Sequence, residues 1–218
     1  MKVYQLFEDA NDPQLYPWLW ENCAPFLEEL MIHPKDGLRD VYDKANMLRG
    51  MENADKVGEE KNFQTSWGDE AHGRILPVRK NRAPRDTHPD LADVIDDMLE
   101  QKFGWRPRES SIFCTGALSV ARAYGKIYRV FPIGQFKYVW SKEIRDITRK
   151  IPILLANVGA MSKDVDEDYP KEVLADFYET LSDNFEGSFL DHDLLGAIQS
   201  KNEIMVSCDK YLIIPLHN

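Results

Sequence analysis

Apolar residues recur at helical spacing in several stretches of the chain. From Leu91 onwards they fall at positions i, i+3, i+4, i+7 and i+8, and the run ends at Phe103-Gly104. Thr87 offers a capping oxygen, and Pro89 is typical of a first helical turn, so a helix is predicted between these points. The same spacing predicts helices over 16–31, 117–124, 144–151, 172–185 and 194–199, and Ser141 is the expected cap of the third of these.

Short apolar runs between Gly, Pro and polar residues predict the strands. They cover 75–78, 110–114, 127–132, 136–140, 203–206 and 211–214, the last two joined as a hairpin by a turn over 207–210. Residues 41–51 are typical of a short helix that runs into a strand, and the polar stretch 52–73 predicts a long excursion. This order predicts an α+β fold, with a helical N-terminal extension (1–40) packed on a core domain (41–218).

Length and composition limit the possible classes of protein. The chain has 218 residues, of which 43% are hydrophobic and 29% charged, which suits one globular domain with an appendage. Its longest apolar run, 151–161, is too short to span a membrane, and residues 1–12 lack the apolar core of a signal peptide. We therefore expect a cytoplasmic protein with no membrane partner. Three cysteines without CxxC spacing indicate neither a disulfide framework nor a zinc site, so no metal is expected.

Charge is distributed unevenly along the chain. Residues 164–193 hold eleven acidic residues and one lysine, and this segment accounts for the whole net charge of −10. It would repel a phosphate backbone, but it could form a solvated helix face or meet a basic partner. Residues 74–85 hold five basic residues and no acidic one, so this stretch is a candidate anion site or ordinary surface charge.

Single clusters of reactive residues give little indication of chemistry. Asp191-His192-Asp193 could bind a metal or move a proton, but it also suits a solvated loop. Cys114 could be a nucleophile if a base activated it, although a small buried side chain is the simpler interpretation. Neither GxGxxG nor GxxxxGK[ST] occurs, so the common glycine-rich phosphate loops are absent from the sequence.

Three separated motifs are more informative when they are taken together. Leu48-Arg49-Gly50-Met51 has an arginine beside a glycine, Ile112-Phe113-Cys114-Thr115-Gly116 precedes a helix-like stretch, and Glu203-Ile-Met-Val206 begins a strand. In this order they resemble the ADP-ribosyltransferase family of mono-ADP-ribosylating toxins and phage enzymes, over roughly residues 45–214. The resemblance implies a split mixed β-sheet with flanking helices. It also implies that NAD is the substrate, that nicotinamide is released, and that ADP-ribose passes to a protein or nucleic-acid acceptor.

The resemblance also implies roles for individual residues. Arg49 would bind the NAD phosphates and Glu203 would stabilise the positive charge on the ribose, while Thr115 would hold the strand below it. Gly50, beside Arg49, would let the ligand approach the backbone. Residues expected to contact NAD in addition are Phe113, Tyr124 and Phe131, of which Tyr124 or Phe131 could stack on nicotinamide, and Arg82, which competes with Arg49 for the phosphates.

The sequence departs from the family pattern at two places. Cys114 and Gly116 stand where the family has serines, and Lys201 stands where arginine-modifying members have Glu or Gln. An ammonium group there would disfavour an arginine acceptor. Two alternatives to an enzyme therefore remain: an inactive domain of the same fold that binds or inhibits a partner, and an unrelated interaction protein.

Overall fold

The computed structural model describes residues 14–64, 70–84, 87–164 and 167–216, and its fold is α+β, as expected. The helices are α1 (Leu15–Glu29), α2 (Gly37–Lys44), α3 (Pro89–Phe103), α4 (Pro107–Ser110), α5 (Leu118–Arg122), α6 (Ile151–Asn157), α7 (Lys171–Phe185) and α8 (Leu194–Ser200), with short 3₁₀ helices η2 (Ala54–Lys56), η3 (Ile147–Arg149) and η4 (Glu186–Ser188). The strands are β1 (Leu48–Met51), β2 (Glu59–Gln64), β3 (Glu70–Pro77), β4 (Ile112–Thr115), β5 (Lys126–Ser141), β6 (Phe189–Leu190) and β7 (Glu203–Pro215).

Two long antiparallel strands, β5 and β7, form the centre of the sheet. The first half of β7 lies between β4 and the second half of β5, whereas the second half of β7 lies between β3 and the first half of β5. Strand β1 pairs with the first half of β5 and meets β4 at the single pair Leu48–Thr115. The sheet is therefore split where β1 and β4 separate. All pairings between the described strands are antiparallel, so the expectation of a mixed sheet was wrong.

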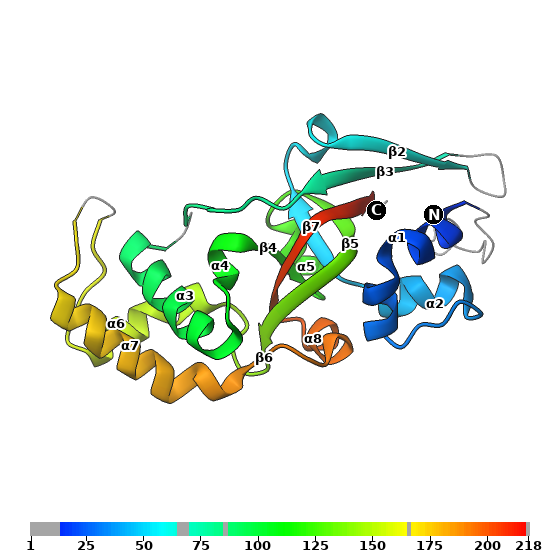
Figure 1. The fold of residues 1–218 in the computed structure, drawn as a ribbon. Coiled ribbons are helices and arrows are strands. Elements are labelled where there is room, and N and C mark those ends of the chain that lie inside the picture. Colours follow the sequence, from blue (N-terminus) through cyan, green and yellow to red (C-terminus); the bar gives the residue numbers. More distant parts are fainter. Residues whose placement is uncertain (1–13, 65–69, 85–86, 165–166, 217–218) are drawn as a thin grey trace.

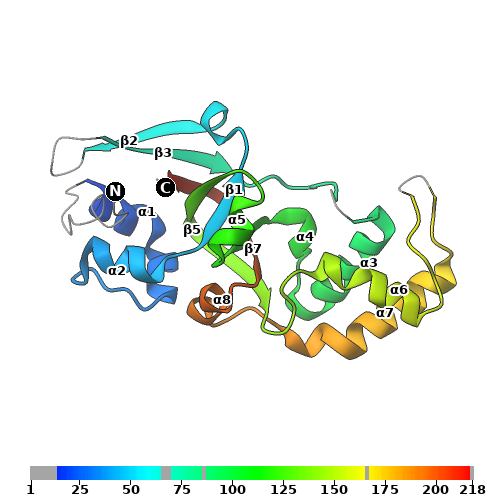
Figure 2. The same cartoon turned by 180° about the vertical axis from the view of Figure 1, so that it is seen from behind.

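Helices cover the sheet from two sides (Figures 1 and 2). Helices α1, α2 and α8 share one hydrophobic cluster with the sheet, and α3, α6 and α7 form a second cluster with the ends of β5 and β7. Apolar residues such as Leu19 and Phe26 are themselves fully buried and pack one face of α1 against the sheet. The expected boundary between residues 40 and 41 falls inside α2.

Several predicted strand ends were wrong. The two strands expected over 127–140 are one strand, because a register shift between Ile133 and Phe136 accommodates Gly134 (φ 69°) as a bulge. The expected terminal hairpin is also one strand, because Ser207 and Cys208 continue the pairing with β5. The predicted excursion over 52–73 instead contains η2, the strand β2 and the first part of β3. Strands β2 and β3 pair with each other, and residues 65–69 between them are outside the described part of the chain.

Two helix starts also differ from the sequence prediction. Helix α3 is capped by His88, whose Nδ1 accepts a hydrogen bond from the Asp90 backbone N–H at 3.3 Å, and not by Thr87. The helix expected after Ser141 is replaced by η3 and α6, and Pro152 lies in the first turn of the latter. Ser141 is the last residue of β5, where its hydroxyl still accepts from the Ile144 backbone N–H at 3.1 Å.

Candidate functional site

The three motif residues lie on neighbouring strands. Leu48, which precedes Arg49, pairs with Thr115, and Thr115 pairs with Glu203. A cavity of about 440 Å³ opens where β1 and β4 separate, and Arg49, Thr115 and Glu203 all line it. The cavity is also lined by the predicted residues Gly50, Arg82, Phe113 and Tyr124, and by Arg108, Arg145 and Asp146, which the sequence analysis did not identify.

Thr115 connects the two ends of the site. Its buried hydroxyl donates to the Lys201 carbonyl oxygen at 3.0 Å and accepts from the Ala117 backbone N–H at 3.0 Å. Lys201 has a left-handed backbone (φ 63°) at the end of α8, two residues before Glu203. Thr115 thus fixes the turn from which Glu203 enters its strand. The Lys201 side chain is exposed and is not part of the cavity lining.

Glu203 is a largely buried carboxylate beside an arginine. Its side chain is 25% exposed, and its Oε1 lies 3.6 Å from Nη1 of Arg108, longer than a hydrogen bond but within ion-pair distance. Its backbone N–H donates to the Arg145 carbonyl oxygen at 3.0 Å. Burial raises the pKa of Glu203 to about 7, Arg108 opposes this rise, Asp146 adds to it and Arg82 again opposes it. The carboxylate therefore changes its charge near neutral pH.

Arginines form one wall of the cavity. Nε and Nη1 of both Arg49 and Arg108 are buried without a hydrogen-bond partner among the described residues. Arg82 stacks on the Phe113 ring at 4.8 Å, and burial followed by the charges of Arg49 and Arg108 lowers its pKa. Unpaired guanidinium donors gathered in a partly buried cavity suit an anion that accepts several hydrogen bonds, such as a diphosphate.

The predicted aromatic contacts divide between the cavity and the core. Phe113 and Tyr124 line the cavity, and Tyr124 is 52% exposed. Phe131, by contrast, is fully buried and packs edge-on against Phe26 at 6.0 Å between ring centres. The expectation that Phe131 stacks on a ligand was therefore wrong, because its ring is enclosed by the core.

Gly50 also has a packing role that the sequence analysis did not foresee. A Cβ on Gly50 would lie 1.8 Å from the Ala121 carbonyl oxygen, so this glycine allows the close approach of α5, whatever it does for a ligand. A Cβ on Gly116 would lie 1.8 Å from the Ile198 carbonyl oxygen in α8. Gly116 is thus required by the packing of α8 against the sheet.

The remaining candidates from the sequence have simple structural roles. Asp193 caps α8 by accepting from the Gly196 backbone N–H at 2.9 Å, and His192 is exposed beside Asp191. Cys114 lines the cavity, but burial raises its pKa to about 12, so it is a thiol at neutral pH. Within the described ranges no group of three or more His, Cys, Asp or Glu is arranged to hold a metal ion.

Searches of protein-family models, curated proteins and solved structures find no match to this chain. Among the described helices, none has the length and apolar character needed to cross a membrane. The geometry of the cavity is therefore the basis for any functional assignment.

Arg108 is, with Arg145 and Asp146, one of the functional candidates that the sequence analysis missed. It lies in the run Trp105-Arg-Pro-Arg108 before β4. Pro107, which begins α4, was the local sign that a helical turn starts here. Only the folded chain shows that this turn brings its guanidinium group to Glu203.

Proposed function

We propose that the chain transfers ADP-ribose from NAD to a macromolecular acceptor and releases nicotinamide. The observation that supports this is the convergence of Arg49, Thr115 and Glu203, from three distant motifs, on one cavity. An unrelated protein with coincidental motifs would rarely bring these three residues together in one cavity. The likeness to the ADP-ribosyltransferase family remains part of the proposal.

In this proposal the arginine wall binds the NAD diphosphate. The unpaired Nε and Nη1 atoms of Arg49 supply two donors, and Arg82, from the segment after β3, adds positive charge. Phe113 and the exposed ring of Tyr124 offer apolar surface for the bases. A cavity of about 440 Å³ has the size of a small-molecule site.

Glu203 would act when the glycosidic bond breaks. The bond between ribose C1′ and the nicotinamide nitrogen breaks, its electron pair leaves with nicotinamide, and positive charge develops on the ribose. The ionised carboxylate of Glu203 stabilises that charge from a fixed position at the start of β7. A nucleophile of the acceptor, or water, then bonds to C1′ and loses its proton.

The test is nicotinamide release from NAD by the purified protein. Glu203→Gln should reduce turnover by roughly 10²–10³-fold with NAD binding retained, because it removes one aimed charge and keeps the volume. Glu143→Gln, at an exposed position after β5, is the matched control and should behave as wild type. Turnover of the Glu203 variant within about threefold of wild type would exclude Glu203 from the reaction.

Calorimetry distinguishes the two candidate phosphate ligands. Arg49→Lys keeps the charge but loses the planar fork, so NAD should bind more weakly, and Arg82→Lys should have the smaller effect. The opposite order would assign the phosphates to Arg82.

An inactive NAD-binding domain is the second candidate. Cys114 and Gly116 supply no hydroxyl beside Thr115, and Glu203 is already paired with Arg108. Binding of NAD without nicotinamide release would favour this alternative.

A further inference from the structure

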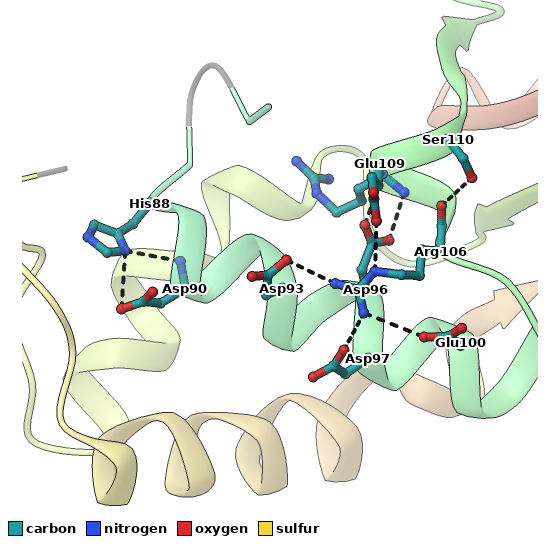
Figure 3. Close-up of polar contacts among 10 residues, drawn as sticks. His88, Asp90, Asp93, Asp96, Asp97, Glu100, Arg106, Glu109 and Ser110 are labelled. Atoms are coloured by element: carbon teal, nitrogen blue, oxygen red, sulfur yellow. Dashed lines mark hydrogen bonds and ion pairs between the residues drawn. The ribbon is translucent and has the colours of Figure 1, made fainter. Parts of the chain in front are cut away.

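The backbone of Arg108 is held in place by a network of polar contacts between α3 and α4. Asp96, which is 3% exposed, accepts hydrogen bonds from the backbone N–H groups of Arg108 at 2.7 Å and Glu109 at 2.9 Å. Its carboxylate thereby anchors the short helix α4 to α3 (Figure 3). The backbone position of Arg108 is fixed by the core of the molecule and not by a surface loop.

Arg106 adds a second attachment of α4 to α3. It bonds Asp93 and Glu109 at 2.9 Å each, it bonds Asp97, and it lies 3.5 Å from Glu100 (Figure 3). Three of these four carboxylates belong to α3, so Arg106 joins the base of α4 along that helix. A network of several charges contributes more to stability than isolated surface pairs do.

The Arg108 side chain leaves this anchor and points to Glu203. It is 11% exposed, its guanidinium lies 5.4 Å from the Phe113 ring centre, and Nη1 lies 3.6 Å from the Glu203 carboxylate. Its Nε and Nη1 have no hydrogen-bond partner among the described residues. The interaction with Glu203 is therefore one of charge across a short gap.

Other charged groups also surround the Glu203 carboxylate. Asp146, just before η3, opposes its ionisation, and Arg82, from the segment after β3, favours it less strongly than Arg108 does. Arg49 and Arg145 line the same cavity. Burial disfavours the ionised form, so the balance of these groups decides whether Glu203 carries a charge at neutral pH.

We propose that Arg108 is a positioning residue whose charge favours the ionised form of the Glu203 carboxyl group, and that Asp96 and Arg106 hold it in place for this task. The catalytic consequence rests on the proposed function. The effect on the carboxylate itself does not, and the two can be measured separately.

The direct test is a ¹³C NMR titration of the Glu203 carboxyl carbon, assigned by its loss in Glu203→Gln. Arg108→Met keeps the aliphatic stem and removes the charge, so the titration midpoint should rise by about 1 to 3 pH units. Arg108→Gln should give a similar rise, and Arg108→Lys should stay near wild type because it retains the charge. Arg39→Gln, on the exposed face of α2, removes the same charge elsewhere and should not move the midpoint.

Nicotinamide release measured across pH provides the second readout. The acid limb of kcat should move upward with the NMR midpoint in Arg108→Met, and the rates should approach wild type at high pH. A purely structural role would lower the rate at all pH values without moving the limb.

The outcomes separate the two proposals. If the midpoint shifts in the folded variants but neither they nor the wild type release nicotinamide, the electrostatic role of Arg108 is supported and the proposed enzymatic function is refuted. An unchanged midpoint in Arg108→Met and Arg108→Gln would overturn the role of Arg108, whatever the turnover. Should both neutral variants fail to fold, Arg106→Gln tests the same proposal. It loosens α4 from α3, so a raised Glu203 midpoint would support the proposal and an unchanged one would refute it.

Discussion

The buried carboxylate of Glu203 should destabilise the folded chain at alkaline pH, so Glu203→Gln should stabilise it there. The native pKa is raised from 4.5 to about 7, so the native carboxyl keeps its proton to a higher pH than the unfolded chain does. Unfolding therefore releases a proton between these values. The free energy of unfolding falls as the pH rises through this window and is level above it.

The size of the effect follows from the shift. A rise of this extent lowers the free energy of unfolding by roughly 3 kcal/mol once the pH exceeds the native pKa. Glutamine has the same volume and no charge to bury, so the variant avoids this loss. Between pH 5 and pH 8 its advantage over wild type should grow by about 2 kcal/mol, which corresponds to roughly 4–8 °C in Tm.

Urea denaturation of both proteins at pH 5 and pH 8 measures this difference. The exposed Glu143→Gln variant is the control, and its difference from wild type should be the same at both pH values. Other groups that titrate in this range cancel, because they are present in every protein compared. If the advantage of Glu203→Gln is equal at pH 5 and pH 8, the carboxylate does not pay a burial cost and the argument is refuted.

Two further predictions concern the packing around the site. Gly116→Ala should destabilise the chain by about 2–4 kcal/mol in urea denaturation, because its Cβ would meet the Ile198 carbonyl oxygen at 1.8 Å; a stability equal to wild type would show that α8 can move away. Thr115→Val should lower the free energy of unfolding by about 1–2 kcal/mol and also slow nicotinamide release, because the hydroxyl bonds to Lys201 and Ala117 are lost. Thr115→Ser keeps the hydroxyl and should have wild-type stability and turnover. Wild-type stability and turnover in Thr115→Val would contradict this prediction.

Local patterns predicted the helices better than the strands. Helix α3 has a clear apolar period and ends at Gly104 in a left-handed conformation, so both its existence and its end were visible. The pair β5 and β7 was cut into pieces because Gly134 and the polar run 207–210 have the composition of turns. Long antiparallel pairing overrides that composition, since a bulge accommodates the glycine and side chains such as Lys210 face outward.

The sequence predicted mainly those residues of the candidate site that lie in the three motifs. Arg49, Thr115 and Glu203 were identified, and the pairing of their strands brings them to one cavity. Arg108 was missed because its proximity to Glu203 depends on how α4 docks on α3, which no local pattern encodes. Phe131 was misplaced for a related reason, since an aromatic on a strand has the same local pattern whether it faces a ligand or the core.

The central pair of strands has a mechanical consequence for the cavity. Because β5 and β7 run through both halves of the split sheet, the two halves are joined by the same two long strands. Closure over a ligand by rotation of one half against the other would break the longest pairing in the molecule. A bound ligand would therefore be enclosed by movement of the two non-strand segments that contain Arg82 and Asp146. Amide protons in β5 and β7 should exchange only when the whole chain unfolds.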